Sequence, residues 1–190
     1  SLWRFRPKTL TVEGLRFTGR WTDDTHMMIG VAESLIANRG FNPEHMIRTF
    51  VRNWEREPWR GYAPGPPTIF RMVKLGIPWS EAAKRLYGGM GSFGNGAAMR
   101  VAPIGLLYHD DEETLRRVAY QSAKLTHAHE LGMEGAAVQA CAVALAVRSR
   151  PGSLDPRDFL ERVANFVRKE VYRRKLREAE CLLEVDDRRV

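Results

Sequence analysis

The chain has 190 residues, of which 44% are hydrophobic and 28% are charged, a composition typical of one globular domain and too apolar for a disordered chain. A formal net charge of +7 indicates an anionic partner, but the basic residues are scattered, so charge alone does not separate nucleic acid from a phosphorylated small molecule. Cys141 and Cys181 lie far apart and form no CxxC motif. They indicate neither a disulfide framework nor a zinc site and favour a reducing cytoplasm.

No segment predicts membrane insertion or export. The basic start, Ser1 to Lys8, is followed by no apolar stretch of the kind that a secretory signal contains. The most apolar segment, Gly135 to Val147, has the length of a buried helix and is well short of the roughly 20 residues that cross a bilayer. We therefore expect one soluble domain over residues 1–190.

Helix signals recur through the first half of the chain. A helix is expected to begin at Asp24 and Thr25, to bury Met28, Val31, Leu35 and Ile36, and to end at Gly40. Asn42 and Pro43 are typical of a second helix start, and Pro58 ends that helix. Residues 61–67 are expected to form a loop, followed by short helices over 68–75 and 80–87.

The second half continues the same pattern. An apolar run over 97–107 precedes a helix that Asp111 caps, with Leu115, Val118, Ala119, Ser122 and Leu125 on one face. Glu134 to Val147 is apolar nearly all round, which predicts a central helix packed on several sides. A long helix is expected from Asp155 to about Leu183. Because no stretch alternates with period two, the predicted fold class is all-α.

Thr22 to Thr25 (TDDT) is the first segment with candidate chemistry. Adjacent carboxylates at a helix start can simply cap the helix and complement its dipole. Alternatively, Asp23, Asp24 and a threonine hydroxyl supply the oxygen ligands that Mg²⁺ or Mn²⁺ prefers. The segment by itself leaves both interpretations open.

Gly88 to Gly96 is the second such segment, with five glycines in nine residues. Glycine lets backbone amides approach a ligand closely, so the segment predicts an anion site, although the GK[ST] ending of a Walker loop is absent. A flexible surface loop is the alternative. It fits poorly with Phe93 at the centre and an apolar run directly after.

His127 and His129 form the third segment, at an expected helix end. Positions i and i+2 of a helix point to different faces, so we expect these two histidines not to bind one metal together. A structural role for either histidine stays open.

Together, WTDDT, RGY, GSFGNGAAMRVAPIGL and LTHAHELGMEGAAVQA, in this order, closely resemble the ADP-ribosylglycohydrolase family over about residues 19–147. The likeness is nearest to the branch that removes serine-linked ADP-ribose and degrades poly(ADP-ribose). It implies a compact all-α domain of orthogonal helices and a metal-dependent hydrolase that cleaves the glycosidic bond at the ribose anomeric carbon. The implied partner is ADP-ribose or an ADP-ribosylated protein.

The resemblance also implies roles for individual residues. Thr22, Asp23 and Asp24 are the implied metal ligands, in a family site that holds two Mg²⁺ ions, or Mn²⁺ in relatives. The segment Gly91, Ser92, Phe93, Gly94, Asn95 and Gly96 would surround the diphosphate and terminal ribose, with Tyr87 and Phe93 at the positions of adenine-stacking aromatics. Gly61 and Gly65 match the family's RGYGxG loop, from which Ala63 and Pro64 depart, and His127 matches a ligand-contacting histidine.

Two parts of the family pattern have no match in these residues: an early glutamate that acts at the reacting centre and a late Asp-x-Asp-Thr that completes the metal pair. We therefore expect a chain truncated at both ends, with no assigned catalytic residue, that binds ADP-ribose weakly and hydrolyses serine-linked ADP-ribose at or near background.

Two other functions remain as alternatives. The first is a non-catalytic ADP-ribose-binding module, which the unmatched acidic motifs favour. The second is an RNA-binding helical protein, suggested by a basic helix near the end of the chain. A solvated helix face explains these basic residues better, so nucleic acid is not the expected partner. The sequence does not determine the linkage cleaved or the oligomeric state. The helix in question carries Arg168, Lys169, Arg173, Arg174, Lys175 and Arg177.

Overall fold

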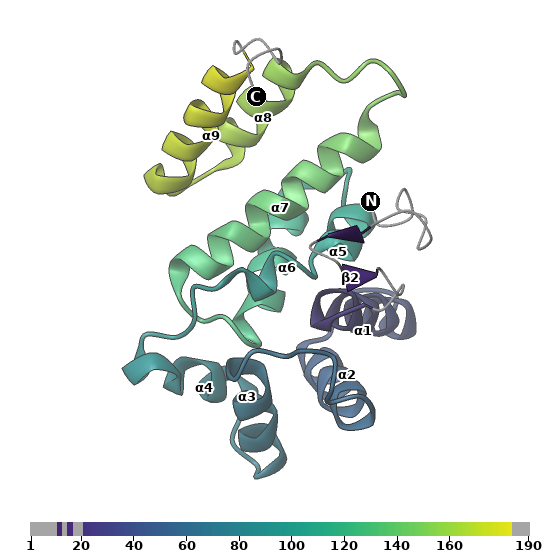
Figure 1. The fold of residues 1–190 in the computed structure, drawn as a ribbon, viewed down its shortest axis with the longest axis vertical. Helices are drawn as coiled ribbons and strands as arrows, with labels where there is room; N and C mark the ends of the chain where they lie inside the picture. Colours follow the sequence, from purple (N-terminus) through teal and green to yellow (C-terminus); the bar gives the residue numbers. More distant parts are fainter. Residues whose placement is uncertain (1–10, 13–14, 17–20, 184–190) are drawn as a thin grey trace.

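A computed structural model describes residues 11–12, 15–16 and 21–183 (Figure 1). Two short strands, β1 (Thr11–Val12) and β2 (Leu15–Arg16), pair antiparallel. All other regular structure in the described residues is helical, which confirms the predicted all-α fold class. The α-helices are α1 (Asp23–Asn38), α2 (Pro43–Arg56), α3 (Gly65–Lys74), α4 (Trp79–Ala82), α5 (Ala102–Leu107), α6 (Glu112–Lys124), α7 (Glu130–Arg148), α8 (Pro156–Phe166) and α9 (Glu170–Leu182). Three short 3₁₀ helices lie between α4 and α5, namely η2 (Ala83–Arg85), η3 (Tyr87–Gly89) and η4 (Asn95–Ala97).

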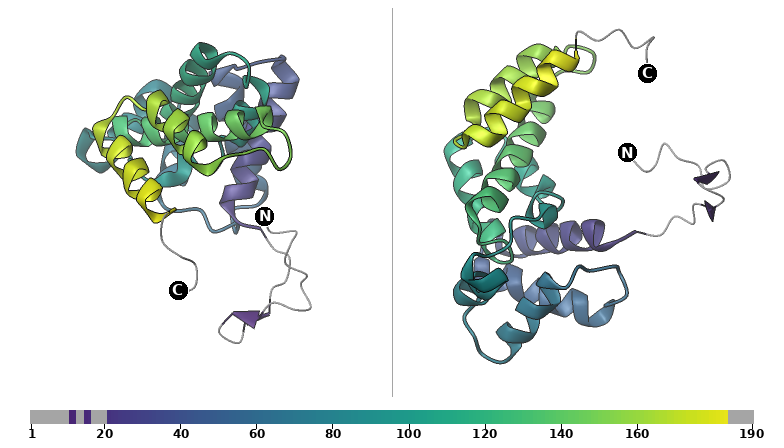
Figure 2. Two further views of the ribbon diagram at one scale, coloured as in Figure 1. Left: turned by 90° about the horizontal axis from the view of Figure 1, so that it is seen from above. Right: turned by 60° about the vertical axis from the view of Figure 1, so that its left-hand side comes forward.

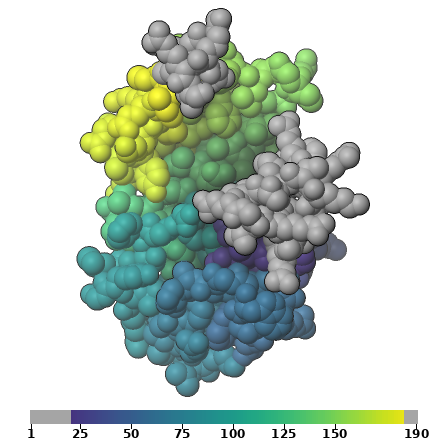
Figure 3. Space-filling view, viewed as in Figure 1, coloured from purple at the N-terminus to yellow at the C-terminus, as the bar shows by residue number. Residues whose placement is uncertain are grey.

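The helices are arranged around α7. Helices α5, α6 and α8 and the short η4 all contact it, while α1 bridges α5 and α2. Helices α1 to α4 gather at one end of the molecule and the α8–α9 pair at the other, as the further views and the space-filling view show (Figures 2 and 3). One cluster of buried hydrophobic residues extends from α1 to α8 in the described part of the chain.

Three predicted helix starts are confirmed by their capping bonds. Asn42 accepts a hydrogen bond from the amide of His45, Asp111 from that of Thr114, and Asp155 from that of Asp158. In each case a side-chain oxygen satisfies one of the amides that a helix leaves without a partner in its first turn.

The buried face and the end of α1 differ from the prediction. His26, Met27, Gly30, Val31, Ser34 and Leu35 are buried, whereas Ile36 is 78% exposed. Arg39, rather than Gly40, adopts the left-handed conformation at the helix end, with φ of 52°. Small residues at 30 and 34 let α2 approach closely, as a β-carbon on Gly30 would lie 3.0 Å from the Phe50 ring.

Two segments between α2 and α5 also differ from expectation. The predicted loop over 61–67 ends early, because α3 already begins at Gly65 and its first turn tolerates Pro66 and Pro67. The helix expected over 80–87 is a single α-helical turn followed by 3₁₀ turns. The peptide chain therefore enters the glycine-rich segment from short, irregular turns.

The central helix α7 begins at Glu130, four residues before the predicted start, and has 19 residues. By length and composition it could cross a membrane, the one such helix among the residues described, but core helices of soluble proteins meet the same criterion. In this fold α5, α6 and α8 pack against it, and it carries the fully buried Glu134. Its packing is that of a core helix.

Glu134 explains why the predicted long helix from Asp155 to Leu183 is wrong. Its carboxylate accepts hydrogen bonds from the Tyr120 hydroxyl and from the amides of Arg168 and Lys169. In an unbroken helix both amides would point along the helix axis and could not reach the Glu134 carboxylate. The chain therefore breaks between α8 and α9. A buried carboxylate thus replaces the helical hydrogen bonds that are lost at the break.

We predict that Glu134→Ala lowers the free energy of unfolding by about 3 kcal/mol, because it leaves one hydroxyl and two amides without their buried acceptor. Urea unfolding measures the change. Glu161→Ala, at an exposed position of α8, is the matched control and is expected to change stability by less than about 0.5 kcal/mol. Equal effects of the two variants would contradict the assigned role of Glu134.

Candidate functional site

The acidic segment forms the N-terminus of α1. Thr22 stands at the cap position, but its side chain caps no amide; its hydroxyl donates instead to a carboxylate oxygen of Asp24 at 2.7 Å. The amide of Asp23 donates to the carbonyl of Arg60 at 2.7 Å, which ties the start of α1 to the loop before α3. Thr22 and Asp24 are exposed and Asp23 is half-buried.

Partial burial and the neighbouring Asp24 carboxylate both raise the pKa of Asp23. The two effects disfavour the ionised form, and a cation beside Asp23 would relieve both. The donors are all oxygen atoms, the type that Mg²⁺ and Mn²⁺ prefer. Within the part of the chain that the structure describes, no third acid, histidine or cysteine joins them as a metal-binding group. The donor set suits a Mg²⁺ ion that retains water and substrate oxygens as its other ligands.

The glycine-rich segment is packed against the start of α7 rather than lying free on the surface. A β-carbon on Gly91, where φ is 72°, would lie 2.8 Å from the amide nitrogen of His129. One on Gly132 of α7 would lie 2.8 Å from the carbonyl oxygen of Ser92. Glycine is required on both sides of this contact because any side chain would separate the two backbones.

His127 and His129 do not lie on a helix, so the prediction that helical geometry separates them is wrong. Both belong to the connection between α6 and α7. His129 caps α7 by accepting a hydrogen bond from the amide of Leu131, and its ring contacts that of Phe93 with centroids 5.2 Å apart. His127 is only 5% exposed, and a β-carbon on Gly96 would lie 2.6 Å from its ring. The two rings thus have separate surroundings.

These elements surround a cavity of about 150 Å³, here called the loop cavity. Eight of the predicted site residues line it: Asp23, Gly65, Tyr87, Ser92, Gly94, Asn95, Gly96 and His127. Five further residues that line the cavity were not predicted: Ala63, Pro66, Leu86, Met99 and Thr126. Most of these are apolar wall residues with no chemical signal in the sequence, although Thr126 stood in the THAH motif.

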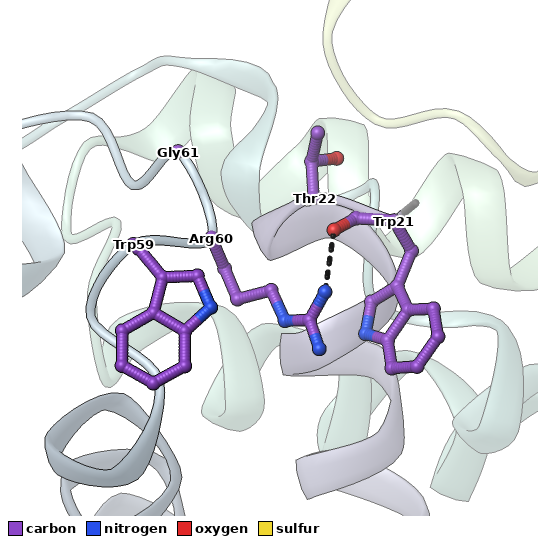
Figure 4. A pocket seen from close by; sticks show the side chains of 5 residues that line it. All are labelled: Trp21, Thr22, Trp59, Arg60 and Gly61. Atoms are coloured by element: carbon purple, nitrogen blue, oxygen red, sulfur yellow. Dashed lines mark hydrogen bonds between the residues drawn. The ribbon is translucent and has the colours of Figure 1, made fainter. Parts of the chain in front are cut away.

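Five predicted site residues do not line the loop cavity: Thr22, Asp24, Gly61, Gly91 and Phe93. Thr22 and Gly61 line a neighbouring cavity of about 530 Å³ with Trp21, Trp59 and Arg60 (Figure 4). There the Arg60 guanidinium lies 4.1 Å from the centroid of the Trp21 ring and donates to the Trp21 carbonyl. Two consecutive residues of the acidic segment, Thr22 and Asp23, therefore line two different cavities.

Two aromatic side chains expose their rings beside the loop cavity. Tyr87 is 62% exposed and lines the cavity, and Phe93 is 66% exposed in the glycine segment. Exposed aromatic rings beside a cavity offer a contact surface for a ligand. Their adenine-stacking role stays a prediction.

Arg100 is a buried cation directly behind the loop cavity and was not predicted. Its guanidinium donates to the carbonyls of Gly96 and Ser122 and to the hydroxyl of Thr126, and it faces the Phe50 ring at 4.9 Å. No acidic side chain among the described residues forms an ion pair with Arg100. Burial lowers the pKa of the guanidinium to about 9, so it stays charged at neutral pH. An uncompensated positive charge therefore lies behind Gly96 and Thr126, both of which line the cavity.

The fold and this site define an all-α protein with a glycine-lined cavity between a buried cation and an acidic helix start. The family model described as ADP-ribosylglycohydrolase matches residues 3–189, so the chain belongs to that family. The chain is 40% identical to the ADP-ribosylhydrolase ARH3 of Gallus gallus over 156 residues. The aligned residues cover 80% of this chain and 41% of that protein.

Two further relatives carry the same name. The protein of Homo sapiens is 40% identical over 137 residues, covering 70% of this chain and 37% of the relative. The protein of Xenopus tropicalis is 35% identical over 177 residues, which cover 92% of this chain and 49% of the relative. The aligned part of this chain thus spans less than half the length of each relative.

We predict that Gly96→Ala lowers the free energy of unfolding by about 1–3 kcal/mol, because the new methyl group collides with the buried His127 ring. Thermal unfolding followed by circular dichroism measures the loss. Gly94→Ala is the control within the same segment: its methyl group meets nothing nearer than the Ser92 hydroxyl at 3.4 Å. If Gly94→Ala is as destabilising as Gly96→Ala, the contact between Gly96 and His127 does not hold the loop.

Proposed function

We propose that this chain binds ADP-ribose and takes part in the metal-dependent hydrolysis that removes ADP-ribose from modified proteins. The bond concerned is the glycosidic bond at the ribose anomeric carbon, with serine as the proposed linkage. The observation that carries the proposal is the convergence of eight predicted site residues, from four separate segments of the chain, on the loop cavity.

The cavity suits one part of ADP-ribose. A volume of about 150 Å³ is below that of a typical site for a whole nucleotide-sized ligand and matches a diphosphate or a ribose better. The amides of Asn95 and Gly96 donate to no described residue, and the positive charge of Arg100 lies behind them. Free amides and a nearby cation favour an anionic group at this position.

The exposed rings of Tyr87 and Phe93 offer a place for the base outside the cavity. An aromatic ring that stacks on a base gains contact area without requiring a specific hydrogen bond. The proposed orientation therefore has the diphosphate at the glycine segment and the adenine against an exposed ring.

The acidic segment would hold the metal. Thr22, Asp23 and Asp24 provide the oxygen ligands, and the family pattern suggests two Mg²⁺ ions, or Mn²⁺, in the complete site. When bound, such an ion supplies positive charge that anchors ribose hydroxyls and favours departure of the leaving group. Because Asp23 lines the loop cavity, a ribose bound in that cavity would lie beside the acidic segment.

A non-catalytic ADP-ribose-binding module is the second candidate. The observation that favours it is that the described residues hold no third acidic or histidine ligand near Asp23 and Asp24. Loss of a group that acts only in the transition state lowers turnover far more than it lowers binding.

A cytoplasmic location stays a prediction.

We predict that Phe93→Ala weakens ADP-ribose binding by about 1–3 kcal/mol, the range for loss of a stacked aromatic ring. Isothermal titration calorimetry with ADP-ribose measures the affinity. Phe93→Tyr keeps the ring and is expected to bind within a factor of about two of the wild type. Equal affinities of the alanine variant and the wild type would remove Phe93 from the site.

We predict that Asp23→Ala and Asp24→Ala each weaken Mg²⁺ or Mn²⁺ binding at least tenfold, or by about 1.4 kcal/mol, because each removes a charged ligand. Metal titration by calorimetry measures this. Asp110→Asn, an exposed acid after α5, is the control and should bind metal like the wild type. Unchanged metal binding in the double alanine variant would exclude the acidic segment as the metal site.

Release of ADP-ribose from a serine-modified peptide, with and without chelator, tests whether the chain's own residues suffice for turnover. The 190 residues are expected to bind ADP-ribose with turnover near background, because two carboxylates alone fix neither a metal pair nor a base. Chelator-sensitive turnover would establish that the chain's own residues complete the site. Absence of ADP-ribose binding would refute both candidates.

A further inference from the structure

The hydroxyl of Thr126 lies between a buried cation and a buried imidazole. Its oxygen is 2.6 Å from Nη1 of Arg100 and 2.8 Å from Nδ1 of His127. Arg100 is fully buried and Thr126 is 1% exposed, so water does not compete for these bonds. The three groups form a short chain that ends at the wall of the loop cavity.

Hydrogen-bond chemistry fixes the direction of this chain. A guanidinium only donates, so the Thr126 oxygen accepts from Arg100. Among the described residues, the remaining partner of the hydroxyl is Nδ1 of His127. If Nδ1 carried a proton, two donors would point at one oxygen and the hydroxyl proton would have no acceptor there. If Nδ1 is unprotonated, the Thr126 hydroxyl donates to it while its oxygen accepts from Arg100, so both bonds of the hydroxyl form.

We infer that Arg100 and Thr126 are positioning residues that hold His127 in the tautomer with its proton on Nε2, so that Nε2 donates a hydrogen bond into the loop cavity. The tautomer itself follows from the contacts of the ligand-free protein. Donation to ADP-ribose is the second part of the inference and rests on the function proposed above.

The position of Nε2 agrees with this role. A β-carbon on Gly94 would lie 3.7 Å from Nε2 and one on Gly96 2.9 Å from it, so this nitrogen faces the glycine segment. No described residue accepts a hydrogen bond from it. Burial, followed by the charge of Arg100, lowers the pKa of His127 to about 3, and the ring is neutral at physiological pH.

The tautomer determines what His127 can bind. A neutral imidazole with its proton on Nε2 offers a donor to the cavity, and its partner is an oxygen such as that of a phosphate or a ribose hydroxyl. The same nitrogen has no free lone pair, so it does not coordinate a metal ion. By fixing this tautomer, Thr126 and Arg100 would restrict His127 to binding the organic ligand and leave metal binding to the acidic segment.

Nuclear magnetic resonance tests the first part directly. Long-range ¹H–¹⁵N correlation spectra of the protein, labelled at histidine, distinguish the two neutral tautomers, and His127→Asn identifies the signals of this ring. We expect the Nε2-protonated form at neutral pH in the absence of ligand. A ring protonated on Nδ1, or a charged ring, in the wild-type protein would overturn the inference whatever the variants do.

Matched variants test the role of Thr126. Thr126→Val keeps the shape but removes the hydroxyl, and is expected to populate the Nδ1-protonated form and to weaken ADP-ribose binding roughly tenfold. Thr126→Ser keeps the hydroxyl and should restore both properties. Thr49→Val, which removes another buried threonine beside a histidine, His45, is the control and should change neither.

The outcomes separate this inference from the proposed function. If ADP-ribose does not bind the wild type but Thr126→Val still changes the tautomer, the positioning chain stands and the proposed function fails. If ADP-ribose binds and Thr126→Val changes neither the tautomer nor the affinity, the inference fails and the proposed function stands. Loss of affinity with an unchanged tautomer would mean that Thr126 acts only through stability.

Discussion

The buried guanidinium of Arg100 is the interaction on which the functional end of this fold depends. Its hydrogen bonds join the glycine segment at Gly96, the last turn of α6 at Ser122 and the α6–α7 connection at Thr126, and its plane faces the Phe50 ring of α2. Removing a charge from water is costly unless several polar groups replace the lost hydration. The three oxygen acceptors provide part of this replacement, and only when all these elements are in place, which couples their positions.

Local signals in the sequence predicted the helix starts well, because a cap is a contact within four residues. Asn42, Asp111 and Asp155 each bond an amide three residues ahead. Predictions failed where a distant residue decides the local structure. The break between α8 and α9 exists because Glu134, more than thirty positions earlier, binds the amides of Arg168 and Lys169. Helix propensity contains no information about such a partner.

The same limit applies to the candidate site. Glycine spacing and paired carboxylates identified segments with chemistry, and the structure brings Asp23, Gly96 and His127 to one cavity. The sequence did not identify Arg100 as part of it. An arginine within the apolar run from Ala97 to Leu107 was the available signal, since a charge there must find buried partners. Two of the three partners come from α6 and the α6–α7 connection, which no local pattern indicates.

The charges around the loop cavity fit a ligand with two chemically different ends. Asp23 lines the cavity, and its raised pKa means that an uncompensated carboxylate is unfavourable there. Arg100 lies behind Gly96 and Thr126 without an acidic partner among the described residues. Each charge lacks its complement, yet the two do not pair with each other. Their effects meet at Tyr62: burial raises the pKa of this hydroxyl most, the charge of Asp23 raises it further and the charge of Arg100 lowers it. A ligand with an anionic diphosphate near Arg100 and a metal-bound ribose near Asp23 would satisfy both, which a simple anion would not.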